Sequence, residues 1–389
     1  MKRIAIVHHI GELGGGTKSL VDVAVMLCDR YEIIICIPQG SFLEVQIEKK
    51  NISIHEMKSG VPYLNLFSGS SPLISKTSLA SLKSLLKMKS FCQEIADINP
   101  DMVLFNSIVT SVSSLKLRGM RCAFIDRETM TNKMYIVLYN RIINSNIKGA
   151  AFLCNYEKRK FWLNNEIITS IIPDCVSEKD LVCMDDIKDV PDDDSYKVLF
   201  MGGSSVLKGA HTVLKAALKL DKDVTVLIAG KFDERIFSIK NILRHLYNPG
   251  FCRHLIILRR AYNIAAKLDN VLFLGLKTDI YPLILKSDMV IFPSSKVHQP
   301  RPCIEAGYFR KPVIISDFEE TKEYFIQGYN ALTFKPNSEN ALAQCIRYAN
   351  ENREEMGILG EHNYEMSMRY HNYKDIKNEL IRFVEQIIE

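Results

Sequence analysis

Residues 287–317 contain the side chains best suited to bind a charged or sugar-like ligand. The apolar run 287–295 has the length of a buried strand, and after a loop a helix is predicted to begin near Cys303. A strand, a loop and a helix in succession build a parallel sheet, whose ligands bind beyond the carboxyl ends of the strands. The first amides of such a helix attract an anion, and Glu305 is placed to accept hydrogen bonds from sugar or ribose hydroxyls. An ordinary helix start, where Glu305 only favours the positive end of the helix dipole, fits the pattern equally well.

A second candidate is a lysine that follows a glycine-rich turn. The predicted strand 197–201 is followed by Gly202, Gly203 and Ser204, and Lys208 stands just before a predicted helix. Glycines let the backbone approach a phosphate closely, and a lysine at the same place adds positive charge. We therefore favour a ligand-binding role for Lys208 over that of a solvated lysine.

A similar turn follows the first strand, where Gly14, Gly15 and Gly16 precede a predicted helix at 19–29. Their spacing is not that of the dinucleotide fingerprint, and the chain has no Gly-Lys-Ser/Thr phosphate loop. The turn either lets backbone amides approach a phosphate or substrate, or is simply a tight connection between strand and helix. Taken alone, it favours the second interpretation.

Composition and charge exclude several classes of protein. The chain has 389 residues, of which 47% are apolar and 24% charged, as is usual for a globular protein of two domains. Its formal charge of +5 is too small for this length to indicate a nucleic-acid-binding protein. It permits attraction to an anionic membrane or an anionic donor.

Cysteine and histidine spacing does not indicate a metal site. The 10 cysteines include no Cys-x-x-Cys pair, and the 9 histidines include no His-Glu-x-x-His. Reduced thiols in a reducing compartment are expected. The sequence shows neither a signal-peptide core nor an uninterrupted apolar stretch of about 18 residues. We expect a cytoplasmic protein without a metal or a cofactor.

The succession of predicted elements indicates two α/β domains. Strands and helices alternate through residues 1–176, and 177–195 is predicted to be a linker because it is acidic and contains Pro191. A second series of strands fills 196–365, and 366–389 has the charged and apolar alternation of a helix.

Two basic segments have alternative interpretations. Residues 79–95 form a predicted helix in which Lys83, Lys87 and Lys89 stand among leucines. A basic amphipathic helix can lie on an anionic membrane, but a surface helix with its lysines in water is favoured. Residues 232–267 are predicted to be an inserted, basic helical segment. Such a segment could contact a membrane or a partner, but we favour a solvent-exposed insertion.

Residues 288–317 resemble the nucleotide-sugar-binding segment of retaining glycosyltransferases of the GT-B fold, family 4 type. The shared pattern is an Asp-apolar-Pro-Ser strand, a loop, Glu-Ala at a helix start, Gly and a Pro-Val strand. The resemblance covers most of the chain and is strongest over 198–334. It implies two Rossmann-like domains that face each other across a cleft. Residues 1–176 would then bind the acceptor and 196–365 the nucleotide sugar, and the helix 366–389 would cross back to the first domain.

The resemblance also implies roles for individual residues. Lys208 would hold the donor diphosphate, and Leu276 would lie in the loop that binds the base. Arg301 matches an arginine of some family members, although a surface arginine is an equally good interpretation. The residues that the resemblance places around the donor are Gly14, Gly15, Gly16, Gly202, Gly203, Ser204, Lys208, Leu276, Arg301, Pro302, Cys303, Ile304 and Glu305.

The chain departs from the family pattern at several positions. The first of two glutamates spaced eight apart is replaced by Val297, and the arginine that usually pairs with the lysine falls at Gly203 or Ser204. A histidine of the first domain aligns with Asp126. A Gly-Gly before the last phosphate contacts is replaced by Phe-Glu-Glu at 318–320.

We therefore predict a hexosyltransferase-like, metal-independent enzyme with Lys208, Glu305 and Asp126 as its catalytic residues. Its donor would be a nucleotide diphosphate sugar and its acceptor a glycan or lipid-linked molecule, in bacterial surface polysaccharide synthesis. The expected location is the cytoplasm, with peripheral contact to the inner face of the membrane. Two alternatives stay open: a catalytically silent GT-B subunit that supports a partner transferase, and a nucleotide-sugar epimerase of the same architecture.

Overall fold

The computed structural model describes residues 1–10, 15–41, 50–66, 76–176, 189–232, 238, 246, 249–277 and 279–389. The chain forms two compact units, one comprising Met1–Asp174 with Tyr373–Glu389 and the other Cys175–Asn372. Residues 177–188 of the predicted linker lie outside the described residues. The C-terminal segment Tyr373–Glu389 therefore returns to the unit in which the chain begins.

The first unit is built on a parallel sheet of seven strands in the order β3-β2-β1-β4-β5-β6-β7. The strands are β1 (Arg3–Val7), β2 (Glu32–Pro38), β3 (Ile52–Met57), β4 (Met102–Phe105), β5 (Arg121–Ile125), β6 (Ile147–Phe152) and β7 (Ile168–Ile171). Its helices are α1 (Gly15–Leu27), α2 (Lys76–Ser84), η2 (Leu85–Lys87), α3 (Met88–Ile98), η3 (Ile108–Lys116), α4 (Lys133–Asn146), α5 (Asn155–Lys158) and α13 (Tyr373–Ile388). Here η marks a 3-10 helix.

Helices cover both faces of this sheet. The helices α3, η3 and α4 share one buried apolar cluster with the strands, whereas α13 packs against α1 and β7. Gly149 in β6 shows how closely α13 approaches the strands, because a Cβ there would lie 2.2 Å from Cδ1 of Ile387. A parallel sheet that is covered on both faces is a doubly wound α/β fold.

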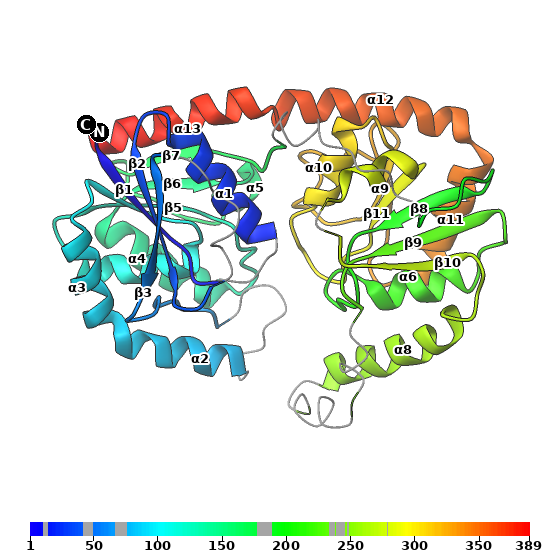
Figure 1. Ribbon diagram of the computed structural model, residues 1–389, viewed down its shortest axis with the longest axis horizontal. Coiled ribbons are helices and arrows are strands. Elements are labelled where there is room, and N and C mark those ends of the chain that lie inside the picture. Colours follow the sequence, from blue (N-terminus) through cyan, green and yellow to red (C-terminus); the bar gives the residue numbers. More distant parts are fainter. Residues whose placement is uncertain are drawn as a thin grey trace. The chain divides into compact units, whose positions relative to one another are not determined.

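The second unit has a parallel sheet of six strands in the order β10-β9-β8-β11-β12-β13. The strands are β8 (Tyr196–Phe200), β9 (Val224–Ala229), β10 (Val271–Gly275), β11 (Met289–Phe292), β12 (Val313–Ser316) and β13 (Leu332–Phe334). Its helices are α6 (Ala210–Ala217), α8 (Pro249–Ala265), α9 (Tyr281–Lys286), α10 (Arg301–Tyr308), α11 (Glu339–Glu351) and α12 (Arg353–Tyr370). Figure 1 shows each unit as a sheet with helices on its two sides. The predicted α/β fold class is confirmed.

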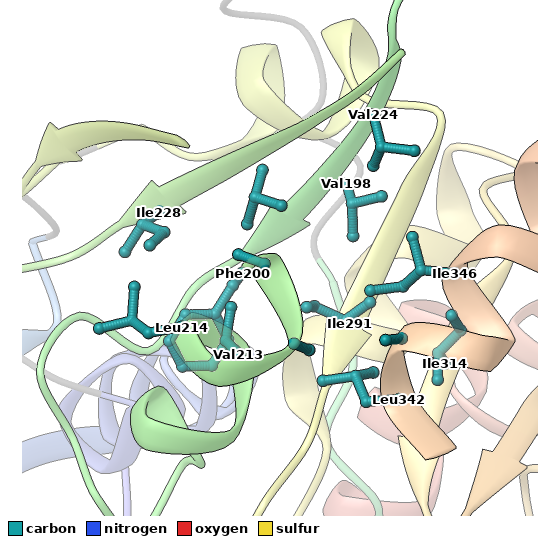
Figure 2. Close-up of a cluster of buried hydrophobic side chains, with 14 of the residues drawn as sticks. Val198, Phe200, Val213, Leu214, Val224, Ile228, Ile291, Ile314, Leu342 and Ile346 are labelled. Atoms are coloured by element: carbon teal, nitrogen blue, oxygen red, sulfur yellow. The ribbon is translucent and has the colours of Figure 1, made fainter. Parts of the chain in front are cut away.

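Buried aliphatic side chains hold the second unit together. Strand residues such as Val198 and Ile291 pack against Val213 of α6 and Ile346 of α11, as Figure 2 shows. Because both faces of the sheet are covered, its strands read in the sequence as continuous apolar runs.

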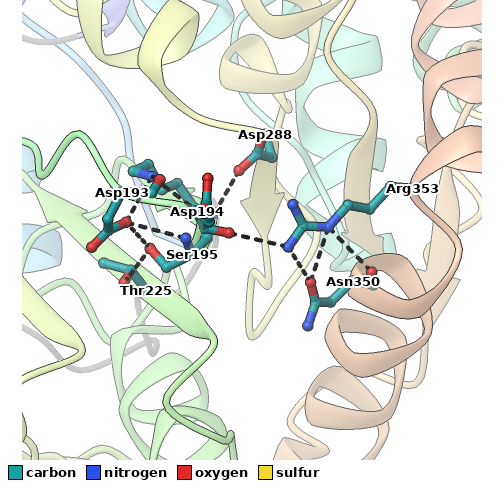
Figure 3. A network of polar contacts seen from close by, with 8 residues as sticks. Asp193, Asp194, Ser195, Thr225, Asp288, Asn350 and Arg353 are labelled. Atoms are coloured by element: carbon teal, nitrogen blue, oxygen red, sulfur yellow. Dashed lines mark hydrogen bonds and ion pairs between the residues drawn. The ribbon is translucent and has the colours of Figure 1, made fainter.

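A polar network lies at the end of the second sheet where the strands begin. Asp288 accepts a hydrogen bond from the amide of Lys197 at 2.7 Å, and the Lys197 ammonium contacts Asp193 at 3.0 Å. Arg353 of α12 donates to the carbonyl of Asp194 at 3.4 Å (Figure 3). Since ligands bind at the carboxyl ends of parallel strands, we assign this network a structural role.

The region predicted as one helix at 79–95 consists of α2, η2 and α3. The 3-10 turn at Leu85–Lys87 separates the two α-helices. The strand β3 was not predicted, although the first four residues of Ile52–Met57 alternate between apolar and polar, as in a strand at the edge of a sheet.

Candidate functional site

In the second unit, the switch point of the sheet lies between β8 and β11, because the strand order continues in opposite directions from these two strands. Loops that follow strands at such a point form the crevice where ligands bind in open α/β sheets. The loop after β8 contains Gly202, Gly203, Ser204 and Lys208, and the loop after β11 leads to α10. The structure therefore brings the two predicted motifs of this unit together.

The two loops are tied closely to each other. The amide of Ser295 donates to the carbonyl of Leu207 at 2.8 Å. Gly209 has φ +88°, and a Cβ there would lie 1.8 Å from the carbonyl oxygen of Pro293. A residue without a side chain is required where the backbones approach so closely.

Three backbone amides of the glycine turn after β8 donate hydrogen bonds within the second unit. The amide of Gly203 donates to the carbonyl of Ala229 at 3.0 Å, and that of Ser204 to Lys231 at 3.1 Å. The amide of Ser205 donates back to Gly202 at 3.1 Å. These three amides have backbone partners in this structure, and the donor-binding role of Gly202, Gly203 and Ser204 stays a prediction. The turn shapes the loop that carries Lys208.

Lys208 is half-buried at this switch point. Burial lowers the pKa of its ammonium group from the ordinary value, while the nearby Glu305 carboxylate acts in the opposite direction. The two side chains therefore interact electrostatically across the two loops. A partly desolvated cation beside an anion is a suitable partner for a phosphate group.

Glu305 forms a buried ion pair with Arg301, one turn earlier in α10. Arg301 Nε lies 3.1 Å from Oε1 of Glu305, and Nη2 of Arg301 donates to the carbonyl of Cys175 at 3.4 Å. The side chains are only 10% and 4% exposed. The interpretation of Arg301 as a surface arginine is therefore wrong, and Glu305 does more than offset the helix dipole.

Helix α10 begins at Arg301, two residues earlier than predicted, with Pro300 as its N-cap. Pro302 has no N–H, and the amide of Cys303 already donates to Pro300 at 2.8 Å. The amide of Ile304 bonds to the same carbonyl at 3.3 Å. The start of this helix thus attracts an anion less than the sequence suggests, and the charge of Arg301 and Lys208 becomes more important.

The remaining donor-binding candidates differ in their exposure. The side chains of Cys303 and Ile304 are buried, and burial together with Glu305 raises the pKa of the Cys303 thiol, so it is an inert core residue. Leu276 directly follows β10 and is 70% exposed. Val297, which stands in the place of the first motif glutamate, is half-buried.

The first unit has its own switch point, between β1 and β4. His8 follows β1 and Asn106 follows β4, and Asn106 Nδ2 lies 3.4 Å from Nδ1 of His8 and 3.4 Å from the carbonyl of Gly16. Arg127, which follows β5, donates from Nε to Asn106 Oδ1 at 3.3 Å and pairs with Asp174. This network was not predicted from the sequence. Its signal is that polar residues directly follow neighbouring apolar strands.

Both histidines of this edge are neutral. Burial, together with His9 and Arg127, lowers the pKa of His8 to about 3, and burial lowers that of His9 to about 4. Within the described residues, Nε2 of His8 is buried without a hydrogen-bond partner. A buried polar atom without a partner is costly, which makes it a candidate for ligand contact.

Asp126 is buried directly after β5, with Oδ1 accepting a hydrogen bond from the amide of Glu128 at 3.0 Å. Burial, followed by the nearby Glu157 carboxylate, raises its pKa well above the usual range. Its Oδ2 has no hydrogen-bond partner in the described part of the chain. Gly14 lies outside the described residues, whereas Gly15 and Gly16 form the start of α1.

The described residues contain neither a metal-binding cluster nor a membrane-spanning helix. No group of three or more His, Cys, Asp and Glu side chains is arranged to hold a metal ion. No helix in this part of the chain is long and apolar enough to cross a bilayer.

Comparison with known proteins finds one matching family. Residues 185–366 match the profile of the family described as glycosyl transferases group 1. No curated protein matches the chain in sequence. Among solved structures, sucrose-phosphate synthase from Thermosynechococcus elongatus superposes with a TM-score of 0.77 at 16% identity, covering 100% of this chain and 99% of that one.

Two further solved structures are similar over nearly their full length. Anabaena HepE in complex with UDP and glucose gives a TM-score of 0.73 at 15% identity, covering 99% of this chain and 100% of HepE. A glycosyltransferase from Rickettsia africae gives 0.72 at 17% identity, covering 100% and 99%. At these identities the likeness shows the fold, which is the GT-B fold.

Proposed function

Because residues 185–366 match the family glycosyl transferases group 1, we propose that this chain is a retaining glycosyltransferase. It is hexosyltransferase-like and moves a sugar from a nucleotide diphosphate sugar to a glycan or lipid-linked acceptor. The UDP bound in HepE supports a nucleotide-sugar donor and makes UDP the first nucleotide to test. We propose bacterial surface polysaccharide synthesis as the setting, in the cytoplasm at the inner face of the membrane.

The observation that carries the proposal is the group of Lys208, Arg301 and Glu305 at the switch point of the second unit. When the bond between the sugar and the donor diphosphate breaks, negative charge develops on the leaving diphosphate. A preorganised cation in a water-poor site stabilises such charge more strongly than water does. Lys208 is a half-buried cation on this edge, so we assign it this role. A divalent metal would then not be needed.

Glu305 is proposed to orient the donor. Its carboxylate accepts from Arg301 Nε at 3.1 Å, which fixes its position at the start of α10. From there we propose that it accepts hydrogen bonds from the ribose hydroxyls. Its negative charge also favours the protonated form of Lys208. Loss of Glu305 would therefore weaken donor binding in two ways, by removing the ribose contact and by removing the charge that favours protonated Lys208.

The first unit is proposed to bind the acceptor. Burial raises the pKa of Asp126, which favours the neutral carboxyl group, and in that form we propose that it donates a hydrogen bond to a sugar or acceptor oxygen. His8 adds a neutral imidazole whose Nε2 is buried. We propose that Gly15 and Gly16, at the start of α1, let the backbone approach a ligand at this edge of the sheet.

Release of nucleoside diphosphate from UDP-, GDP- and ADP-linked sugars tests the proposal. Wild-type protein should release diphosphate from one donor class, also after treatment with EDTA, and faster with a lipid-linked glycan present. Lys208→Ala should lose most of this activity. No release from any donor by folded protein would contradict the proposal.

Val297 supports a second candidate function, that of a silent subunit which assists a partner transferase. An apolar residue in the place of the first motif glutamate removes a carboxylate from the sugar side of the site. Such a subunit would bind a donor weakly or not at all and release no diphosphate by itself. Val297→Glu would then not restore release.

A further inference from the structure

Helix α2 and the 3-10 turn η2 present three of their four leucines to solvent and their serines to the protein, whereas Leu85 packs against the apolar core of the first unit. Leu79, Leu82 and Leu86 are 56%, 48% and 86% exposed, whereas Ser78 and Ser81 are buried. The three leucines are spaced three and four residues apart, so they share one side of the helical segment. This is the reverse of the arrangement that packs a surface helix onto a core.

The inward side of the helix is nevertheless well anchored. The Ser81 hydroxyl donates to the carbonyl of Ser78 at 2.8 Å, and the Ser84 hydroxyl donates to the carbonyl of Tyr63 at 3.0 Å. The amide of Tyr63 donates to Ser84 Oγ at 3.0 Å in return. The Ser81 bond lies within α2, whereas the two bonds between Ser84 and Tyr63 hold the end of the helix against the protein and favour the outward position of the leucines.

Lysines flank the leucines. Lys83, Lys87 and Lys89 are all exposed on the same succession of α2, η2 and the start of α3. With about 100° between successive helical residues, Lys83 and Lys87 fall on one side of the leucines and Lys89 on the other. We call these three leucines and three lysines the leucine–lysine surface. An apolar stripe bordered by lysines is complementary to an anionic bilayer.

We propose that the leucine–lysine surface docks the first unit onto an anionic phospholipid membrane. The leucines enter the boundary between headgroups and acyl chains, while the lysines contact the lipid phosphates. The proposal deepens the proposed function, since a lipid-linked acceptor would be presented at the same membrane. It concerns lipid binding alone, which is measured without a sugar donor.

The neighbouring surface indicates how selective this docking is. A hollow of about 780 Å³ beside Lys87 is lined by lysines, by His55 and by the carboxylates Glu94 and Asp97. His55 Nε2 lies 2.9 Å from Glu94, which also accepts from the amides of Lys58 and Ser59. Because these polar groups are already paired with one another, the hollow offers no specific site for one phosphorylated headgroup. We therefore expect binding to follow surface charge rather than headgroup identity.

Co-sedimentation with lipid vesicles tests the proposal. Wild-type protein should bind vesicles of phosphatidylglycerol and phosphatidylcholine, bind pure phosphatidylcholine far more weakly, and be released by high salt. Lys83→Glu with Lys89→Glu should weaken binding by more than about fivefold per lysine. Leu82→Ser with Leu86→Ser should weaken it about tenfold or more. Phosphatidylserine should replace phosphatidylglycerol with the same affinity.

Matched controls come from the second unit. Ile358 is 57% exposed on α12, and Lys267 is exposed just after α8. Ile358→Ser and Lys267→Glu make the same chemical changes outside the surface and should leave vesicle binding unchanged. Calorimetric binding of a nucleotide sugar should be equal in all variants, which separates failure of docking from failure of the proposed transferase function.

Three outcomes would overturn the proposal. Wild-type protein could fail to bind anionic vesicles, or the leucine and lysine variants could bind them as well as the controls do. Sedimentation velocity could instead show a dimer that Leu82→Ser with Leu86→Ser dissociates without lipid, which would assign the surface to a second copy of the chain.

Discussion

Replacing Glu305 by alanine is expected to destabilise the second unit much more than the loss of an ordinary ion pair does. The Arg301 and Glu305 side chains are 10% and 4% exposed and lie 3.1 Å apart. Removing one partner leaves an uncompensated charge in a low-dielectric environment, which typically costs about 3–5 kcal/mol. Lys208 loses the same compensating charge, so a value in the upper part of this range is expected.

The same unit contains a matched control. Arg310 and Glu361 form an ion pair whose side chains are 51% and 54% exposed. Exposed pairs contribute about 0–1 kcal/mol, so Glu361→Ala should cost less than about 1 kcal/mol. Glu305→Gln keeps an acceptor for Arg301 but removes the charge, and its cost should lie between the two alanine variants.

Urea unfolding measures these differences. The chain has a single tryptophan, Trp162, which lies in the first unit, so its fluorescence reports on that unit. Far-ultraviolet circular dichroism reports on both units, and the effect of Glu305→Ala should appear in this signal without a matching change in fluorescence. Equal losses for Glu305→Ala and Glu361→Ala would refute the reasoning that the pair at the switch point is buried and coupled.

Three further predictions follow from the same features. Lys208→Ala should reduce turnover about 100-fold or more at unchanged melting temperature, by analogy with the loss of one oxyanion donor, whereas Lys267→Ala should leave initial rates unchanged. For Asp126, burial raises the folded-state pKa well above the unfolded value of 3.8, so stability falls as pH rises above 3.8. Asp126→Asn does not titrate, so its melting temperature should gain on that of wild type as pH rises from 3.8, whereas a difference that stays constant with pH would contradict the raised pKa. Gly209 has φ +88°, and a Cβ added there would lie 1.8 Å from a carbonyl oxygen, so Gly209→Ala should lower the free energy of unfolding by several times the ~1 kcal/mol typical of a mutation. Gly357 lies in a helix with open space around it, so Gly357→Ala should raise the free energy of unfolding by about 0.5–1 kcal/mol. Thermal unfolding measures both changes.

The sequence predicts the position of the donor-side residues well because strand ends are local signals. Lys208 follows the strand that becomes β8, and Glu305 follows the one that becomes β11. Parallel strands place their carboxyl ends at one edge of a sheet, so the order of residues along the chain is enough to predict that both lie at one site. The roles assigned to them remain proposals.

The hydrogen-bond partners of loop amides are harder to predict from the sequence. Gly203 and Ser204 look like free phosphate-binding amides, but they donate to Ala229 and Lys231, at the end of the neighbouring strand β9 and just after it. Such partners depend on the path of a loop that is distant in the chain. Pro302 differs, because proline has no backbone N–H and the absence of this donor follows from the residue type alone.

The network of the first unit depends on contacts of still longer range. His8 and Asn106 are 98 residues apart, and Arg127 meets Asp174 across 47 residues. Hydrophobic periodicity also does not say which side of a short helix faces inward. In α2 the buried contacts of Ser84 decide the question, and they come from Tyr63.

The most direct test of the account is a thermal-shift comparison of wild-type protein and Lys208→Ala with UDP-, GDP-, ADP- and CMP-linked sugars. We expect one nucleotide class to raise the melting temperature of wild type and to raise that of the variant much less, since a ligand that binds the folded state stabilises it. An equal shift in both proteins would place the donor away from Lys208. No shift with any nucleotide sugar, in folded wild-type protein, would contradict a donor site in the second unit.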